Sequence, residues 1–184
     1  FEPLFHEHSY GFRPGRSTPQ AIAQVRRALS EGKEWVIDVD VRKYFDSVNH
    51  ELLLDAVNEE VSDGSVLRLL RMFLESGVME DGVWRETEEG TPQGGVISPL
   101  LANIYLNRFD WKMAQAGYEV VRYADDFVVL CRSKEEAEGA YKHIRHIIED
   151  ELRLQIHPDK TRILYHKEGA FDFLGFMIHR RYLW

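Results

Sequence analysis

Two adjacent aspartates, Asp125 and Asp126, lie between two apolar stretches of the sequence. The β-branched and aromatic residues of 120–123 and 127–130 predict two strands, and the residues between them leave room only for a tight turn. Two carboxylates held side by side repel each other, and a cation shared between them relieves that repulsion. The pair is therefore a candidate metal site at the tip of a β-hairpin, with ordinary turn chemistry as the alternative.

A second acidic pair lies in the stretch 35–41, whose β-branched content predicts a strand. Asp38 and Asp40 alternate with apolar residues there, so they share one face of the strand. A carboxylate on a mostly apolar strand is unfavourable unless it is paired or metal-bound. Asp40 and Asp125 would together suit phosphoryl transfer, in which carboxylates hold two divalent ions roughly 3.5–4 Å apart. Because 85 positions separate them, only the fold decides whether they meet.

Capping residues, apolar spacing and turn residues predict the elements that must position these aspartates. Helices are predicted over 17–30, 64–76, 98–115 and 133–151, and another is capped by Asp46 or Asn49 and ends near residue 57. Strands are predicted over 154–165, with a turn at 157–159, and over 171–178, together with a polar hairpin over 77–90 and a glycine-rich loop over 90–95. The inner stripe of the helix over 64–76 is expected to contain Val66, Leu69, Leu70 and Phe73. Intermixed strands and helices indicate an α+β fold, an antiparallel sheet with helices packed on one face.

The length of 184 residues, with 44% apolar and 29% charged residues, predicts one soluble globular domain. No apolar run reaches the roughly 18 residues of a transmembrane helix, so we expect no membrane contact and a cytoplasmic location. The sequence starts at Phe1 without a signal peptide, so we expect it to be part of a longer polypeptide. Cys131 is the single cysteine, which excludes an internal disulfide, and its apolar surroundings predict a core residue.

The net charge of −8 argues at first sight against a protein that binds nucleic acid. The charges are unevenly distributed, however. Residues 44–90 contain 12 acidic and 3 basic groups, a net charge of −9, whereas residues 152–184 contain 6 basic and 3 acidic groups, a net charge of +3. The acidic middle is expected to be a solvated outer face that a polyanion would avoid.

Six segments, taken in order, resemble reverse transcriptases, specifically the fingers–palm part of a bacterial group II intron-type enzyme. They cover nearly the whole chain: SYGFRPGRS (Ser9–Ser17), WVIDVDVRKYFDSVNHELL (Trp35–Leu53), EGTPQGGVISPLLANIYL (Glu89–Leu106), RYADDFVVL (Arg122–Leu130), LQIHPDKT (Leu154–Thr161) and FDFLGF (Phe171–Phe176). The resemblance implies a right-hand polymerase palm with partial fingers, in which about 1–34 are fingers and 35–184 are mostly palm. The family's thumb and N-terminal fingers have no counterpart here, so the segment alone is expected to be weakly active or inactive.

The resemblance also implies a metal site. Asp40 and Asp125 would be the principal ligands, together with the carbonyl oxygen of Val41, and Asp126 would be a weaker third carboxylate. These groups would hold two Mg²⁺ ions, with Mn²⁺ as a substitute. Asp38 would be an auxiliary or structural residue.

Five further residues take substrate-binding roles by the same resemblance, each with a simpler alternative. Phe45 would lie beneath the deoxyribose of the incoming nucleotide, or would be ordinary core packing. Gln93 would lie beside the nascent base pair and template, or would only hydrogen-bond its own loop. Lys160 would approach the triphosphate, or would be solvated. Arg13 and Arg16 would contact template or primer strands, or would brace the fingers.

Phe173, Leu174 and Gly175 resemble the primer grip, where glycine permits a close backbone approach. The implied function is DNA synthesis on an RNA template from a DNA or RNA primer and deoxynucleoside triphosphates, within a group II intron-encoded protein that binds intron RNA. The alternatives are a retron-type or CRISPR-associated reverse transcriptase, a related polymerase that makes RNA, and an RNA-binding splicing (maturase) module with an inactive polymerase site. The presence of all three metal carboxylates favours the enzyme.

Overall fold

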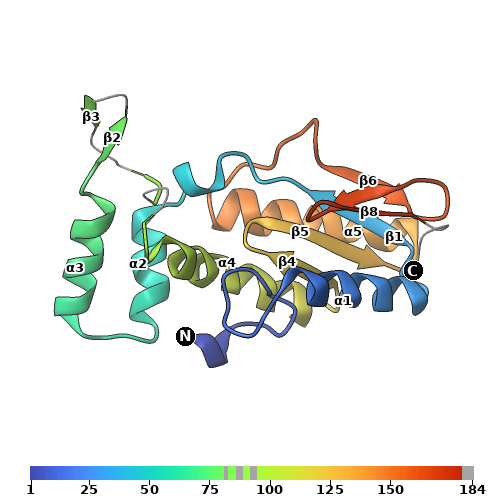
Figure 1. Cartoon of the computed structure of the whole chain (residues 1–184), viewed down its shortest axis with the longest axis horizontal. Coiled ribbons are helices and arrows are strands. Elements are labelled where there is room, and N and C mark those ends of the chain that lie inside the picture. Colours follow the sequence, from blue (N-terminus) through green and yellow to red (C-terminus); the bar gives the residue numbers. More distant parts are fainter. Residues whose placement is uncertain (81–82, 86–88, 92–94, 180–184) are drawn as a thin grey trace.

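A computed structural model describes residues 1–80, 83–85, 89–91 and 95–179. Its centre is a four-stranded antiparallel sheet with the strand order β4-β5-β1-β6 (Figure 1). These strands are β1 (Trp35–Val39), β4 (Glu119–Tyr123), β5 (Asp126–Cys131) and β6 (Arg162–Tyr165). Two separate hairpins are formed by β2 (Val78–Glu80) with β3 (Val83–Arg85), and by β7 (Phe171–Phe173) with β8 (Phe176–Ile178). Strand β1, which carries Asp38 and leads to Asp40, therefore lies beside β5, which begins at Asp126.

The α-helices of the described residues lie close to their predicted positions. They are α1 (Thr18–Ser30), α2 (His50–Asn58), α3 (Gly64–Leu74), α4 (Ser98–Gln115) and α5 (Lys134–Arg145), the last continuing into a π-helical turn (His146–Glu151). Side-chain oxygens of Asn49, Asp63 and Ser133 accept backbone N–H groups at the starts of α2, α3 and α5. These caps satisfy donors that have no partner inside a helix, and so fix where each helix begins.

Apolar side chains alternate along the strands and are buried on both faces of the sheet. Ile37, Val39 and Phe127 belong to the core that includes α4 and α5, whereas Val36 and Val128 belong to the core beneath α1 and the β7–β8 hairpin. The antiparallel α+β fold is confirmed, with helices α4 and α5 on one face. The second face is also covered, by α1 and β7–β8, because central strands that are apolar on both sides must be buried on both sides.

The predicted strand over 154–165 is wrong in its first part, because only β6 is a strand of the sheet. The turn predicted at 157–159 is confirmed, since residues 158–160 form a turn. The residues before β6 run instead beside the end of β1, where the His157 N–H donates to the carbonyl oxygen of Asp40 at 2.8 Å. Pro158 follows without an N–H to donate, which limits further ladder pairing. The residues before β6 therefore form a loop that lies against the end of β1.

The predicted strand over 171–178 is a hairpin of two strands, β7 and β8, joined by Leu174 and Gly175. Both turn residues have positive φ, 55° and 79° respectively. A two-residue hairpin turn with this backbone suits glycine, and one glycine here is enough to reverse the chain.

Helix α3 packs mainly against α2, at the end of the molecule away from the four-stranded sheet (Figure 1). The prediction that Val66 and Leu69 face inward is wrong, since they are 39% and 65% exposed. The predicted Leu70 and Phe73 do pack against the core, together with Leu67. A helix with a single neighbour buries one narrow stripe, so the remaining apolar residues stay in solvent. Across the described residues, no helix is long and apolar enough to cross a membrane.

Candidate active site

The register of β1 and β5 brings the two acidic motifs to one end of the sheet. Val39 lies opposite Phe127, so Asp40, which follows Val39, leaves its strand next to Asp126, which precedes Phe127. Side chains alternate along a strand, so Asp38, Asp40 and Asp126 project toward the same face of the sheet. Asp125 lies in the turn that joins β4 to β5. Acidic residues that are distant in sequence are therefore neighbours in the fold.

The electrostatics of the hairpin tip show the same proximity. Partial burial raises the pKa of the half-buried Asp125, and the negative charge of Asp40 raises it further. Asp126 reaches solvent, but partial desolvation and then the charges of Asp125 and Asp40 raise the pKa of its carboxyl group. Carboxylates that raise one another's pKa repel each other when they are ionised, and a bound cation relieves that repulsion. Carboxylate oxygens are the ligands that Mg²⁺ prefers, so these groups have the chemistry that binds this ion.

Two basic side chains partly neutralise the negative charges of Asp38 and Asp40. Lys160 Nζ donates to Asp40 Oδ2 at 3.2 Å, and Arg162 Nε donates to Asp38 Oδ2 at 3.3 Å. Desolvation raises the pKa of Asp38, against the opposing effect of Arg162. Among the residues that the structure describes, no three His, Cys, Asp or Glu side chains are grouped closely enough to hold a metal ion. Asp40 is thus engaged with Lys160, and a complete ligand cluster is not formed.

The sequence interpretation missed Arg122, whose side chain hydrogen-bonds the turn at the tip of the β4–β5 hairpin. It lies in β4, and its guanidinium is completely buried. Its nitrogen atoms donate to Asp110 Oδ1 at 2.8 Å (Nε), to Asn103 Oδ1 at 3.0 Å (Nη1) and to the carbonyl oxygen of Ala124 at 2.8 Å (Nη1). The available signal was a cation among the apolar residues 120–123, because a buried cation requires a partner.

The N-terminal segment also packs against this hairpin. Ser9 forms a parallel bridge with Arg122, and the Tyr10 N–H donates to the Arg122 carbonyl oxygen at 2.8 Å. Gly11 follows at a very close approach, since a Cβ atom there would lie 2.2 Å from the backbone nitrogen of Ala124. Only glycine fits at that position without moving the turn. The SYGF motif thus packs against the turn that contains Asp125.

Phe45 lies in a 3₁₀ turn (Tyr44–Asp46) just beyond the acidic strand. Its ring is half-buried against the core and contacts Tyr44 edge-on. The Thr91 N–H donates to the Phe45 carbonyl oxygen at 2.7 Å, which ties the glycine-rich loop to this turn. Gln93 lies outside the described residues, so its predicted place beside the base pair stays a prediction.

The two predicted strand-binding arginines differ in their surroundings. The Arg13 side chain is only 4% exposed and pairs with Glu2, and it donates to the carbonyl oxygens of His6 and Ser9 at 2.7 Å each. These contacts favour the alternative that Arg13 braces the fingers segment. Arg16 donates to the Glu7 carbonyl oxygen at 2.7 Å and lies in a more open position.

The predicted primer grip is the β7–β8 turn, on the face of the sheet that α1 covers. Phe173 is buried in that core, Leu174 is half-buried, and Gly175 is exposed. Phe176 and Met177 beyond the turn are 46% and 68% exposed. Apolar side chains are therefore available to solvent near the hairpin turn, on the face toward which Asp38 and Asp40 project.

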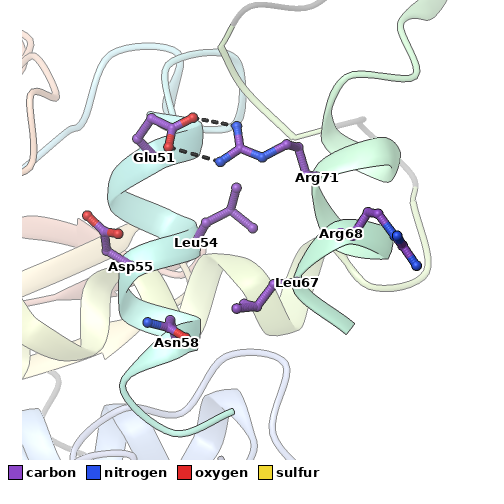
Figure 2. A pocket seen from close by; sticks show the side chains of 7 residues that line it. All are labelled: Glu51, Leu54, Asp55, Asn58, Leu67, Arg68 and Arg71. Atoms are coloured by element: carbon purple, nitrogen blue, oxygen red, sulfur yellow. Dashed lines mark hydrogen bonds and ion pairs between the residues drawn. The ribbon is translucent and has the colours of Figure 1, made fainter. Parts of the chain in front are cut away.

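A separate pocket of about 360 Å³ lies between α2 and α3. Figure 2 shows Glu51 and Arg71 paired at one end of it, with Leu54 and Leu67 between the two helices. The Arg71 Nη2 to Glu51 Oε2 distance is 3.0 Å. None of the predicted catalytic or substrate-binding residues that the structure describes lines this pocket, so it is separate from the carboxylate site.

The family described as "Reverse transcriptase (RNA-dependent DNA polymerase)" matches residues 1–178. The chain belongs to this family. The reverse transcriptase chain is 36% identical over 222 residues to Protein YkfC of Escherichia coli (strain K12), covering 98% of the chain and 57% of that protein. It is 26% identical over 245 residues to Group II intron-encoded protein LtrA of Lactococcus lactis subsp. cremoris, covering 98% of the chain and 41% of that protein.

A solved structure shows the same fold at low identity. Apo telomerase from Candida tropicalis, truncated from its C-terminal domain, superimposes with a TM-score of 0.73 and 16% identity, covering 95% of this chain and 40% of that one. The reverse transcriptase chain therefore has the fold of a right-hand polymerase palm fragment. It spans about half the length of the curated relatives described above.

Proposed function

We propose that the full-length protein is an RNA-directed DNA polymerase of group II intron type, and that the end of the sheet between β1 and β5 is its nucleotidyl-transfer site. The observation that carries the proposal is the meeting of Asp40 with the Asp125–Asp126 turn within a chain of the reverse transcriptase family. In the reaction, the primer 3′ oxygen forms a bond to the α-phosphorus of a deoxynucleoside triphosphate. The bond from that phosphorus to the bridging oxygen of pyrophosphate breaks.

The chain's own groups would provide most of the positioning on which this reaction depends. Asp40, Asp125, Asp126 and the Val41 carbonyl would hold two Mg²⁺ ions, which when bound neutralise phosphate charge and activate the primer hydroxyl. Lys160 already faces Asp40. Its ammonium group would release that carboxylate on metal binding and would then stabilise the charge of the leaving pyrophosphate.

The substrates follow from the same assignment. An RNA template paired with a DNA or RNA primer would lie across the face that carries the β7–β8 turn, with Phe173, Leu174 and Gly175 as the primer grip. Arg16 would contact a nucleic-acid strand, and residues before about 35 would form part of the fingers. The likeness to an intron-encoded protein supports intron RNA as a further partner and keeps RNA splicing as a second activity of the same polypeptide.

Primer extension on an RNA template by the full-length protein tests the proposal. We expect deoxynucleotide incorporation that requires Mg²⁺ or Mn²⁺, and its loss in Asp125→Asn. Asp55→Asn is the matched control, because this exposed carboxylate lies on α2 beside the separate pocket. Incorporation of ribonucleotides only, or equal incorporation by the wild type and Asp125→Asn, would contradict the proposed function.

A further inference from the structure

The buried guanidinium of Arg122 donates to three partners, and one of them is the backbone of the aspartate turn. All of its nitrogen atoms are engaged, with Nε and Nη2 on the Asp110 carboxylate and Nη1 shared between Asn103 and the Ala124 carbonyl. A buried guanidinium is tolerated when its charge is paired and its remaining N–H groups are hydrogen-bonded. Asp110 pairs the charge, and the bond from Nη1 to the Ala124 carbonyl reaches the turn residue that immediately precedes Asp125.

A second observation, independent of the ion pair, concerns the opposite side of the same turn. Gly11 lies against the backbone nitrogen of Ala124, so closely that no Cβ atom could be accommodated. The Asn103 side chain joins the two contacts, because its Nδ2 donates to the Gly11 carbonyl oxygen at 2.8 Å while its Oδ1 accepts from Arg122. Ala124 is thus held by hydrogen bonding at its carbonyl and by contact at its amide.

The backbone of Ala124 also indicates that its place is imposed. Its φ of 59° lies in the left-handed region, which an alanine rarely adopts. Such a conformation persists only when the surrounding contacts determine it. Those contacts are the Arg122 guanidinium and Gly11, and both belong to parts of the chain that lie outside the turn itself.

We propose that Arg122 is a positioning residue for nucleotidyl transfer: through the Ala124 carbonyl, it fixes the backbone that presents the Asp125 carboxylate. The inference rests on the proposed function, which makes Asp125 a metal ligand. Lysine cannot replace Arg122 in this role, because a single ammonium group does not reproduce the planar fork that spans Asp110, Asn103 and Ala124. Asp110 and Asn103 act through Arg122 by holding that fork in place.

The test uses two substitutions of different kinds in the full-length protein. Arg122→Lys keeps the buried charge and removes the fork. The double variant Arg122→Met with Asp110→Leu removes the ion pair as a unit, so that no charge is left buried without a partner. Arg145→Met is the matched control, since Arg145 makes an exposed ion pair on α5. Each protein is measured for thermal unfolding, for kcat and KM of one deoxynucleotide on one RNA template, and for amide hydrogen exchange.

We expect kcat per folded molecule to fall by about 100-fold in Arg122→Lys and in the double variant, because a displacement of about 1 Å at a reacting group has that effect. We expect KM for the nucleotide to change by less than about threefold. The amides of 123–127 should exchange faster, while those of α5 keep wild-type rates. The control should match the wild type in all measurements. Unchanged kcat per folded molecule, or unchanged exchange at 123–127, would overturn the inference.

A third variant covers the outcome in which both Arg122 variants fail to fold. Asn103→Leu keeps the Arg122–Asp110 pair and removes only the link to Gly11 and one contact to the fork. We expect faster exchange at 123–127 and about a tenfold lower kcat, and unchanged values would again overturn the inference. Failure of the proposed function is distinguishable, because the wild type would then incorporate no deoxynucleotide while the exchange measurement would still report whether Arg122 holds the turn.

Discussion

Val39 lies directly opposite Phe127 in the antiparallel pair of β1 and β5. This one register pair decides that the residues just beyond it, Asp40 and Asp126, emerge at the same end of the sheet. A shift by one residue would send one of the carboxylates to the opposite face and separate the acidic motifs. The candidate site therefore depends on apolar residues that carry no chemistry themselves.

Replacing the turn aspartate should separate activity from stability. Because the fold raises the pKa of Asp125, its ionised form is disfavoured in the folded state, and Asp125→Asn should raise the thermal unfolding midpoint in metal-free buffer at neutral pH. The same variant of the full-length protein should lose at least about 100-fold in synthesis, since a metal ligand is removed. Added Mg²⁺ should stabilise the wild type more than the variant. A variant that is both less stable and fully active would contradict this assignment.

The ring of Phe45 is expected to select the sugar of the incoming nucleotide. A ring packed beneath the sugar leaves a 2′-hydroxyl without room or partner, and each effect is worth roughly 1–3 kcal/mol. Phe45→Ala in the full-length enzyme should therefore admit ribonucleotides while largely sparing deoxynucleotides. The measurement is the ratio of incorporation efficiencies for a deoxynucleotide and its ribonucleotide on one RNA template.

Phe73→Ala is the control for that experiment, because Phe73 is also a partly buried ring against the core but lies on α3. It should lower stability and leave the sugar ratio unchanged. If the two variants have the same ratio as the wild type, Phe45 is only a packing residue.

Adding one methyl group at Gly11 should displace the aspartate turn. The new Cβ atom would lie 2.2 Å from the Ala124 nitrogen and 2.8 Å from the Tyr123 carbonyl carbon, both of which are backbone atoms. Overpacking of this kind costs typically about 1–3 kcal/mol, so Gly11→Ala should lower the free energy of unfolding by at least that amount. Chemical denaturation measures the change.

Gly139→Ala is the matched control for Gly11→Ala. Gly139 lies inside α5, and its added Cβ would meet only the Tyr118 hydroxyl at 3.4 Å. The higher helix propensity of alanine should stabilise this variant by up to about 1 kcal/mol. Equal effects of the two substitutions would show that the contact at Ala124 is not the cause.

The Cys131 thiol should be inert in the folded protein. It is completely buried, and burial raises its pKa to about 12. A thiol-disulfide reagent at about pH 8 should therefore react only as the chain unfolds, because the thiolate is the reactive form. Ser65→Cys provides an exposed thiol on α3 for comparison. Rapid stoichiometric labelling of Cys131 under native conditions would contradict its burial.

His166 should make the fold sensitive to acid. Both ring nitrogens are buried and have no hydrogen-bond partner among the residues that the structure describes, and burial lowers the pKa of the ring. Since the unfolded chain gains a proton near the ordinary pKa of about 6.5 and the folded chain does not, stability should fall as the pH drops below that value, by at most about 1.4 kcal/mol per pH unit. His166→Phe should remove this component. His146→Phe, at an exposed position, should not.

The sequence alone determined the family, the carboxylates and most of the elements of this protein. Local patterns suffice for the elements, because capping residues and apolar spacing involve neighbouring positions. The family and the polymerase palm follow from the resemblance of six motifs taken in order, which requires no knowledge of strand pairing. The buried face of α3 was predicted only in part, since which stripe is buried depends on the neighbour that covers it.

Only the tertiary structure decided what surrounds the aspartates. Four features depend on long-range packing or on backbone freedom at single residues. They are the pairing of Asp40 with Lys160, the burial of Arg13, the second covered face of the sheet and the hairpin in place of one strand over 171–178. The Arg122 network is the clearest example, because it joins β4 to the turn after it, to α4 and to the N-terminal segment. A charged residue among the apolar residues of a strand indicates that it has a buried partner. Which residue is that partner depends on how the helix and the sheet pack together.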